Sequence, residues 1–306
     1  MRIVFAGSPA AAVPSLDAIV GSRHELVAVI TREDSRQGRR GVMTPTPVAV
    51  TAERRGIDVI RAHRLSDSTT ARVAELAPDL GVIVAYGGLV REPLLSLPRL
   101  GWINVHFSAL PRWRGAAPVQ RAIIAGDETT GVTVFQLVPE LDAGDILGAV
   151  SEPIGRHETA GNLLSRLATI GAGLLAETID ALAEGTAIAT PQHGDVTVAP
   201  KLSIDDGRLD FSRSATEVYN RIRGVTPEPG AFTSIDGVRL KILDAAPARG
   251  VAPLAPGELD LRGRAVVVGT ADEPIELVRV QPAGRTAMDA AAWWRGRPAD
   301  AGRVAE

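Results

Sequence analysis

The sequence has 306 residues and a mass of 32.1 kDa, which exceeds the roughly 100 to 200 residues of a typical single domain and therefore predicts two domains. Apolar residues make up 45% of it and charged residues 23%, a balance typical of globular chains and not of disordered or membrane-embedded ones. The absence of Cys excludes disulfides, Cys-based zinc sites and a cysteine nucleophile, and the net charge of −3 argues against indiscriminate binding of polyanions.

Two features bear on the compartment of the protein. The longest apolar stretch, residues 80–90, is much shorter than the ~20 residues that a membrane-spanning helix needs. The apolar run at the start of the sequence is shorter than the roughly 7 to 15 residues of a signal peptide. We therefore expect a cytoplasmic protein with no membrane partner.

The first half of the chain alternates short β-branched runs with helical patterns, which is typical of a parallel sheet. The strands are expected at residues 2–6, 25–31, 58–61, 80–85, 102–106, 131–138 and 146–154. The helices are expected at residues 10–22, 47–55 and 68–76, in a Pro-flanked segment before Trp102, and at residues 159–184, where a long apolar stripe closes the domain.

The composition changes after this long helix, because residues 185–207 are rich in Pro, Gly, Asp and Thr. We predict a first domain at 1–187, a linker at 188–206 and a second domain at 207–306. A helix capped by Ser214 and short strands at 231–235, 239–245, 257–261, 265–269 and 275–282 indicate a small barrel. The predicted fold is α/β: a Rossmann-like, mostly parallel sheet followed by an OB-like β-barrel.

Asn104 and His106 lie two residues apart at the end of an expected strand, so their side chains point to the same face of the sheet. Ligands bind open α/β sheets at the carboxyl ends of strands. An amide donor beside an imidazole suits chemistry at a carbonyl group, where negative charge develops on oxygen. A capped strand end with a satisfied polar pair explains the same spacing.

Two loops accompany this strand. Residues 108–115 are rigid, aromatic and without a regular period, which is typical of ligand-holding loops and also of structural turns. Asp142 lies in a turn between two later strands, where an Asx turn accounts for it equally well. If that turn lies near His106, its carboxylate can orient the imidazole or accept a proton.

Basic residues gather in the expected loop at residues 31–47, which is long enough for contacts with phosphate groups, although a solvated charge run has the same composition. In the second domain the numbers of acidic and basic residues are nearly equal, so any nucleic-acid contact there requires a one-sided distribution. The candidates for it are Arg221, Arg223, Arg239 and Lys241.

Taken together, these segments resemble methionyl-tRNA formyltransferases. The resemblance begins at residues 5–9, includes 84–87, 104–106, 108–121 and 141–145, and continues through 201–202, 209–211 and 222–223, weakening after about Leu243. Ala109 stands where the family commonly has Leu. The resemblance implies transfer of a formyl group from 10-formyltetrahydrofolate to the α-amino group of methionyl initiator tRNA, for translation initiation.

The resemblance also implies site residues. It assigns catalysis to Asn104, His106 and Asp142: Asn104 and His106 bind and polarise the formyl carbonyl, and Asp142 helps to set protonation and water in the site. From these parts we expect Asn104 and protonated His106 to stabilise the oxyanion and Asp142 to accept the proton of the ammonium group, through water. The donor-binding residues it implies are Ser108, Ala109, Leu110, Pro111, Tyr86 and Gly87, and the tRNA-binding residues are Arg39 and Arg40. No metal is expected, and the partners are initiator tRNA and folate for a protein acting as a monomer.

Other interpretations remain open. A nicotinamide dehydrogenase would share the alternating pattern, but the first turn at residues 6–10 lacks the G-x-G-x-x-G fingerprint. Formyl transfer to glycinamide ribonucleotide or to an amino sugar uses a similar Asn, His and Asp set. A non-catalytic RNA-binding protein on the same fold is the alternative from a different class.

Overall fold

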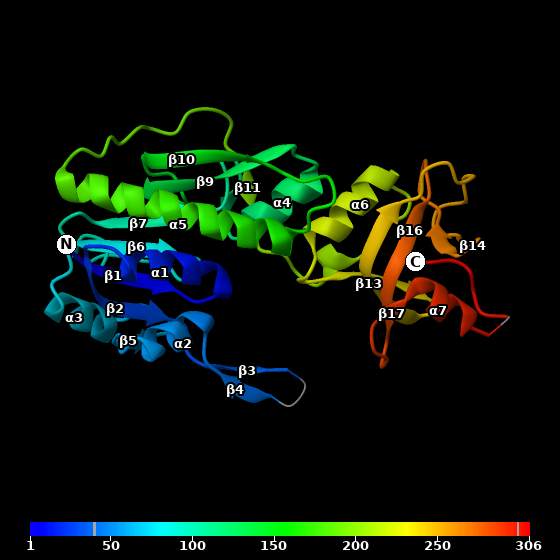
Figure 1. Cartoon of the computed structure of the whole chain (residues 1–306), viewed down its shortest axis with the longest axis horizontal. Coiled ribbons are helices and arrows are strands. Elements are labelled where there is room, and N and C mark those ends of the chain that lie inside the picture. Colours follow the sequence, from blue (N-terminus) through cyan, green and yellow to red (C-terminus); the bar gives the residue numbers. More distant parts are fainter. Residues whose placement is uncertain (39–40, 299) are drawn as a thin grey trace. The chain divides into compact units, whose positions relative to one another are not determined.

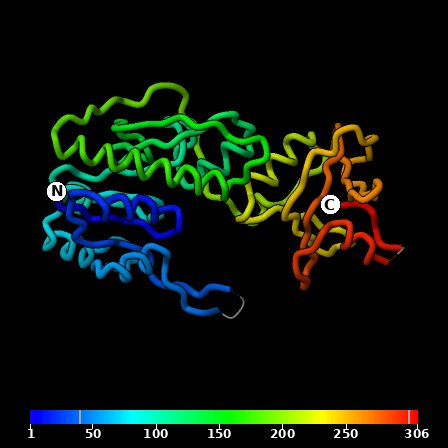
Figure 2. Tube along the Cα trace, in the orientation of Figure 1, coloured from blue at the N-terminus to red at the C-terminus, as the bar shows by residue number. Residues whose placement is uncertain are grey.

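The computed structural model describes residues 1–38, 41–298 and 300–306, which form two compact units. The first unit comprises Met1–Pro118, Thr129–Pro153 and Leu164–Ala199, and the second comprises Val119–Glu128, Ile154–Leu163 and Pro200–Glu306. Figure 2 traces the chain from blue to red, so that the segments which each unit takes from different parts of the sequence can be followed.

A seven-stranded sheet with the order β10-β9-β7-β6-β1-β2-β5 is the centre of the first unit (Figure 1). Its strands are β1 (Arg2–Gly7), β2 (Glu25–Thr31), β5 (Val59–Arg61), β6 (Leu80–Val84), β7 (Trp102–His106), β9 (Thr129–Gln136) and β10 (Ile146–Pro153). The strands from β7 to β5 pair in parallel, whereas β9 and β10 are antiparallel to their neighbours. The predicted mostly parallel, Rossmann-like sheet is confirmed.

The helices up to residue 184 match the predicted patterns except for α4 (Pro118–Ala125), which was not predicted. They are the 3-10 turn η1 (Ala10–Ala12), α1 (Val13–Val20), α2 (Pro47–Arg54), α3 (Asp67–Glu75), α4 (Pro118–Ala125) and α5 (Ala160–Glu184). Helix α2 begins where the Thr46 side chain accepts a hydrogen bond from the Ala49 N–H and Pro47 supplies a preset φ. Across the described ranges, none of the helices has both the length and the apolar character required to cross a membrane.

The pairing of β6 with β7 depends on one small residue. A Cβ atom at Gly81 of β6 would lie 2.1 Å from the ring of Trp102, which begins β7 and is fully buried. The indole N–H donates to the Leu94 carbonyl at 2.9 Å. This packing holds β7 in register, and β7 ends at His106.

Two local expectations were wrong. The described residues 91–98 form turns instead of the Pro-flanked helix, because Pro93 and Pro98 lack an N–H and leave too short a segment for a run of helical hydrogen bonds. Part of the expected loop at 31–47 forms a two-stranded antiparallel hairpin of β3 (Ser35–Gln37) and β4 (Val42–Thr44).

Residues 190–199 run along the first unit, although the sequence gives this stretch the composition of a linker. Thr190 pairs with Ile146 through hydrogen bonds of 2.8 and 2.9 Å. Strand β11 (Val198–Ala199) pairs in parallel with β8 (Arg114–Gly115). This stretch is therefore fastened to the loop that follows β7.

The second unit is a curled antiparallel sheet of the kind predicted. Its strands are β12 (Ala231–Ile235), β13 (Val238–Pro247), β14 (Leu259–Arg262), β15 (Ala265–Val268), β16 (Ile275–Pro282) and β17 (Met288–Asp289), in the order β12-β13-β16-β15-β14 with β17 beside β16. It also contains a 3-10 turn, η2 (Asp205–Gly207), and the helices α6 (Ala215–Gly224) and α7 (Ala290–Arg295). Trp293 and Trp294 of α7 pack against its core.

Two devices stabilise this unit. Helix α6 begins with a capping box. The Ser214 side chain accepts a hydrogen bond from the Glu217 backbone N–H, and the Glu217 side chain accepts one from the Ser214 backbone N–H. Residues 303–306 bond to both outer margins of the sheet: Ala305 N–H donates to Gly257 at 2.8 Å, and Glu306 N–H donates to Ser234 at 2.9 Å. One segment thus joins the margin at β12 to the margin near β14.

Candidate active site

Asn104 and His106 lie on one face of β7, as the spacing predicts. Asn104 pairs with Ile83 of β6 and Phe135 of β9, and His106 lies opposite Thr133 of β9. The Asn104 side-chain amide is partly exposed and has no hydrogen-bond partner among the residues that the structure describes. His106 is only 6% exposed, so an accessible amide lies two residues from a buried imidazole.

The main chain determines which nitrogen of His106 carries the proton. Nε2 lies 2.8 Å from the Trp113 carbonyl oxygen, and a carbonyl only accepts, so Nε2 is the donor. Nδ1 then faces Oδ2 of Asp142 at 3.8 Å. That distance is longer than a direct hydrogen bond, so the carboxylate acts on the ring only electrostatically, by favouring its protonated form.

Burial lowers the pKa of the His106 imidazole, while the Asp142 carboxylate and the Trp113 carbonyl act in the opposite direction without overcoming it. The ring is therefore neutral at pH 7 in the resting site. A neutral resting ring has an Nδ1 lone pair that can accept a proton. The protonated His106 expected from the sequence stays a prediction for the reaction itself.

Asp142 lies on the turn between β9 and β10, and the fold brings it beside His106. Its φ of 45° falls in the left-handed region, which residues other than Gly rarely adopt. Its Oδ2 accepts a hydrogen bond of 2.7 Å from the Gly115 N–H. The carboxylate thus joins its own turn to the loop that supplies the Trp113 carbonyl.

The loop after β7 is held by internal hydrogen bonds. Ser108 is fully buried, and its hydroxyl donates to the Arg112 carbonyl at 2.6 Å. Thr133 Oγ1 donates to the Ser108 carbonyl at 2.7 Å and accepts from the Leu110 N–H at 3.3 Å. Of the four predicted donor-binding residues here, Ala109 is exposed, whereas Ser108, Leu110 and Pro111 are buried.

The other two predicted donor-binding residues follow β6. Tyr86 is 1% exposed, and its hydroxyl donates to the Ala62 carbonyl at 2.9 Å, so its ring belongs to the core. Gly87 is exposed with a φ of 74°. The Arg32 guanidinium donates to the carbonyls of Tyr86 and Gly87 and lies over the Tyr86 ring, 5.8 Å from its centre.

Three residues of this site were missed by the sequence analysis: the Trp113 carbonyl, Thr197 and Gln192. Thr197 Oγ1 accepts from the Trp113 N–H at 2.8 Å, and Gln192 contacts the backbone around Asp142. No sequence signal identifies a backbone acceptor, because every residue type has one. Thr197 and Gln192 fall in the stretch predicted as a linker.

The predicted tRNA-binding residues Arg39 and Arg40 lie outside the described residues. Among the second-unit candidates, Arg223 is only 8% exposed and donates to the Gly155 and Glu158 carbonyls at 3.0 Å. Burial lowers the pKa of its guanidinium. Arg239 lies 3.6 Å above the centre of the Phe232 ring.

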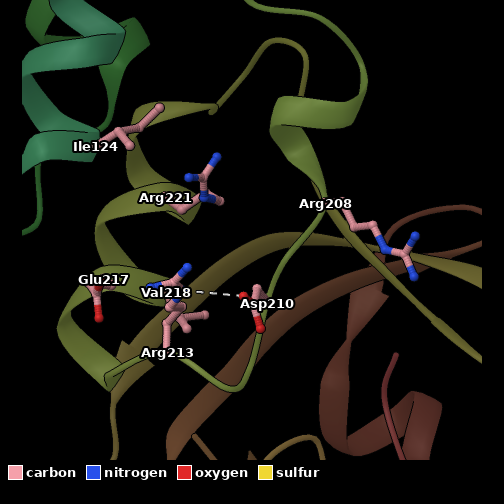
Figure 3. A pocket seen from close by; sticks show the side chains of 7 residues that line it. All are labelled: Ile124, Arg208, Asp210, Arg213, Glu217, Val218 and Arg221. Atoms are coloured by element: carbon pink, nitrogen blue, oxygen red, sulfur yellow. Dashed lines mark hydrogen bonds and ion pairs between the residues drawn. The ribbon is translucent and has the colours of Figure 1, made fainter. Parts of the chain in front are cut away.

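Arg221 lines a pocket of 470 Å³ in the second unit with Arg208 and Arg213 (Figure 3). Asp210 forms an ion pair of 3.3 Å with Arg213, drawn as the dashed line in Figure 3. The Arg221 guanidinium donates to the Asp206 carbonyl at 3.0 Å. Three cations and two acids, Asp210 and Glu217, therefore line the pocket, which leaves a positive balance.

The chain matches the family described as Formyl transferase over residues 1–179 and the family described as Formyl transferase, C-terminal domain, over residues 201–298. The methionyl-tRNA formyltransferase of Clavibacter sepedonicus is 59% identical, with 97% of each chain covered. That of Leifsonia xyli subsp. xyli is also 59% identical, over 98% of this chain and 99% of the relative.

Two solved structures share the fold. The methionyl-tRNA formyltransferase from Clostridium thermocellum has a TM-score of 0.60 at 17% identity, covering 82% of this chain and 95% of its own. A sugar 3N-formyl transferase, WlaRD, has a TM-score of 0.70 at 18% identity, covering 94% and 99%. The two family matches and the 59% identity to curated relatives over nearly the full length show that the chain belongs to the methionyl-tRNA formyltransferase family.

Proposed function

We propose that this chain transfers the formyl group of 10-formyltetrahydrofolate to the α-amino group of methionyl initiator tRNA, for translation initiation. The observation that carries the proposal is the arrangement of His106: Nε2 is held by a main-chain carbonyl at 2.8 Å and Nδ1 faces a carboxylate at 3.8 Å, on the strand that presents the Asn104 amide. The near full-length similarity to methionyl-tRNA formyltransferases supports the choice of acceptor.

The residues present fit a formyl donor, which supplies the reacting carbonyl carbon and N10 as the leaving group. The Asn104 amide, without a hydrogen-bond partner among the described residues, donates to the formyl oxygen and stabilises the negative charge that develops there. Because β7 fixes the backbone on both sides of Asn104, the amide needs little reorganisation during the reaction.

His106 moves the proton. The methionyl nitrogen forms its bond to the formyl carbon while the bond from that carbon to N10 breaks, so one proton must pass from the amine to N10. Neutral Nδ1 accepts the proton and returns it to the leaving nitrogen. The Asp142 carboxylate stabilises the transient imidazolium, and the Trp113 carbonyl keeps the ring in orientation.

We assign direct contact with the formyl donor to those predicted donor-binding residues that are exposed. Ala109 and Gly87 present accessible surface to the donor, while Ser108, Leu110, Pro111 and the Tyr86 ring shape the backbone behind them. The Ser108 hydroxyl is occupied by the Arg112 carbonyl, so its role is to hold the loop.

We assign tRNA contact to Arg39 and Arg40 and, in the second unit, to the pocket of Arg208, Arg213 and Arg221. Roughly half to two-thirds of all hydrogen bonds between proteins and DNA go to phosphate and sugar, and accessible guanidinium groups are suited to bind phosphate. Buried Arg223 is not assigned to this role. The domain limits at 1–187, 188–206 and 207–306 stay a prediction, and we propose a monomer that acts in the cytoplasm.

The test is formyl transfer from 10-formyltetrahydrofolate with three acceptors offered separately: methionyl initiator tRNA, glycinamide ribonucleotide and an amino-sugar nucleotide. Transfer to the tRNA alone is expected. Transfer to either small amine instead would keep the catalytic assignment and remove the tRNA roles. Absence of transfer to all three would overturn the proposed function.

A further inference from the structure

Gln192 uses both ends of its side-chain amide beside Asp142. Its Nε2 donates to the backbone carbonyl of Asp142 at 2.8 Å and to that of Gly144 at 2.9 Å. Its Oε1 accepts from Arg114 Nε at 3.2 Å and from Arg114 Nη2 at 2.6 Å. One partly buried side chain therefore joins the Asp142 turn to the loop that contains Trp113 and Arg114.

The backbone that Gln192 holds is one that needs support. Asp142 has a φ of 45°, a left-handed conformation that is unfavourable for a residue with a Cβ. At Gly144 a Cβ atom would lie 1.8 Å from the Gln136 carbonyl oxygen, so the turn is tightly packed against β9. The two hydrogen bonds from Gln192 bracket the strained residue.

Gln192 is itself fixed by the chain on both sides. Thr190 pairs with Ile146 at the start of β10. Thr197 Oγ1 accepts a hydrogen bond from the Trp113 N–H at 2.8 Å, and the Thr197 carbonyl accepts one from the Arg114 N–H at 2.9 Å. The backbone that carries Gln192 is therefore fixed, so its side-chain amide can hold the turn in one position.

We propose that Gln192 is a positioning residue for formyl transfer, which holds the carboxylate of Asp142 at its distance from His106 by fixing the backbone of residues 142–144. This inference rests on the proposed function, because it matters only if Asp142 and His106 carry the reaction. Small displacements of a reacting group lower the chemical rate by as much as ~100-fold, whereas substrate binding far from that group is unaffected.

The decisive variant is Gln192→Glu, which keeps the size of the side chain and the oxygen that Arg114 contacts, but replaces the donor to the two carbonyls by an acceptor. We expect kcat to fall by about 10- to 100-fold, with KM for methionyl-tRNA within about twofold of the parent. His193→Ala is the matched control, because His193 is the exposed neighbour in the same segment. Thermal unfolding of each variant is measured in parallel.

A double-mutant cycle separates positioning from general support. If Gln192 acts through Asp142, then Gln192→Glu causes little further loss of kcat in an Asp142→Ala background. Equal losses in both backgrounds would overturn the inference, and so would an unchanged kcat or an unfolded Gln192→Glu chain. The parent chain is assayed alongside: if it transfers no formyl group to methionyl-tRNA, the proposed function fails. If the parent is active and Gln192→Glu has the kcat of the parent, only this inference fails.

Discussion

The ionisable side chain of His106 is buried, whereas two of the arginines in the pocket of the second unit are exposed. His106 is 6% exposed, with one nitrogen bonded to a main-chain carbonyl and the other facing Asp142. Arg208 and Arg213 are exposed, and Arg213 is already paired with Asp210. Burial fixes the position and protonation of one atom, whereas exposure leaves charges that salt and solvent screen. Changes at His106 should therefore alter the chemical step, and changes in the pocket should alter binding alone.

The largest effect is expected from His106→Ala. Loss of a general acid–base group typically lowers the rate by ~10²- to 10⁴-fold, and we expect kcat to fall in this range. Single-turnover transfer at saturating methionyl-tRNA measures it, and filter binding of the tRNA shows whether affinity is retained. A kcat within about twofold of the parent would remove His106 from the mechanism and erase the contrast between the two regions.

The pH dependence tests the buried side of the comparison. Burial lowers the pKa of His106 below its ordinary 6.5, so kcat should stay level above that pH and fall only as the medium becomes more acidic than the lowered value. Between that value and 6.5 the unfolded chain binds a proton that the native ring does not, so the free energy of unfolding decreases as the pH falls through this interval.

A pH–rate profile and urea unfolding between about pH 5 and 8 measure both effects. In the His106→Gln variant this contribution to the pH dependence of unfolding should disappear. An acid limb of kcat above pH 6.5 would contradict the neutral resting ring.

A moderate effect is expected from Arg208→Ala and Arg221→Ala. Each should raise KM for methionyl-tRNA severalfold and reduce the slope of log affinity against log salt by about one, with kcat unchanged. Arg249→Ala, at another exposed position of the second unit, is the control. If the control and the pocket variants have the same salt dependence, the pocket holds no phosphate.

The smallest effect concerns stability. Ser214→Ala removes the capping box of α6 and should lower the free energy of unfolding by about 1 kcal/mol. Differential scanning calorimetry measures the shift, and Ser214→Thr, which retains a capping hydroxyl, is the control. An equal shift in both variants would mean that the hydroxyl is not the source of the stabilisation.

The sequence indicated the strands at residues 25–31, 102–106, 231–235 and 275–282 to the residue, because β-branched runs there are bounded by turn-forming residues. The hairpin of Ser35–Gln37 and Val42–Thr44 was missed because its first strand is wholly exposed and polar, without apolar alternation. The helix expected before Trp102 was wrong because two Pro residues interrupt its hydrogen bonds.

In the site, the common face of Asn104 and His106 followed from their spacing alone. The groups that contact these two residues could not be predicted from the spacing. The Trp113 carbonyl is a backbone group, and Gln192 lies 50 residues from Asp142 along the chain, so only the folded arrangement joins them. The catalytic roles themselves stay a prediction until kinetics are measured.

The segment of residues 303–306 has a consequence for solubility. By bonding to Ser234 on one side and Gly257 on the other, it occupies backbone groups at two strand margins at once. Unpaired margins of this kind recruit strands from other molecules and favour aggregation. A chain cut before Arg303 would leave the backbone groups at both margins unpaired. Residues 303–306 therefore complete the sheet and also reduce its tendency to self-associate.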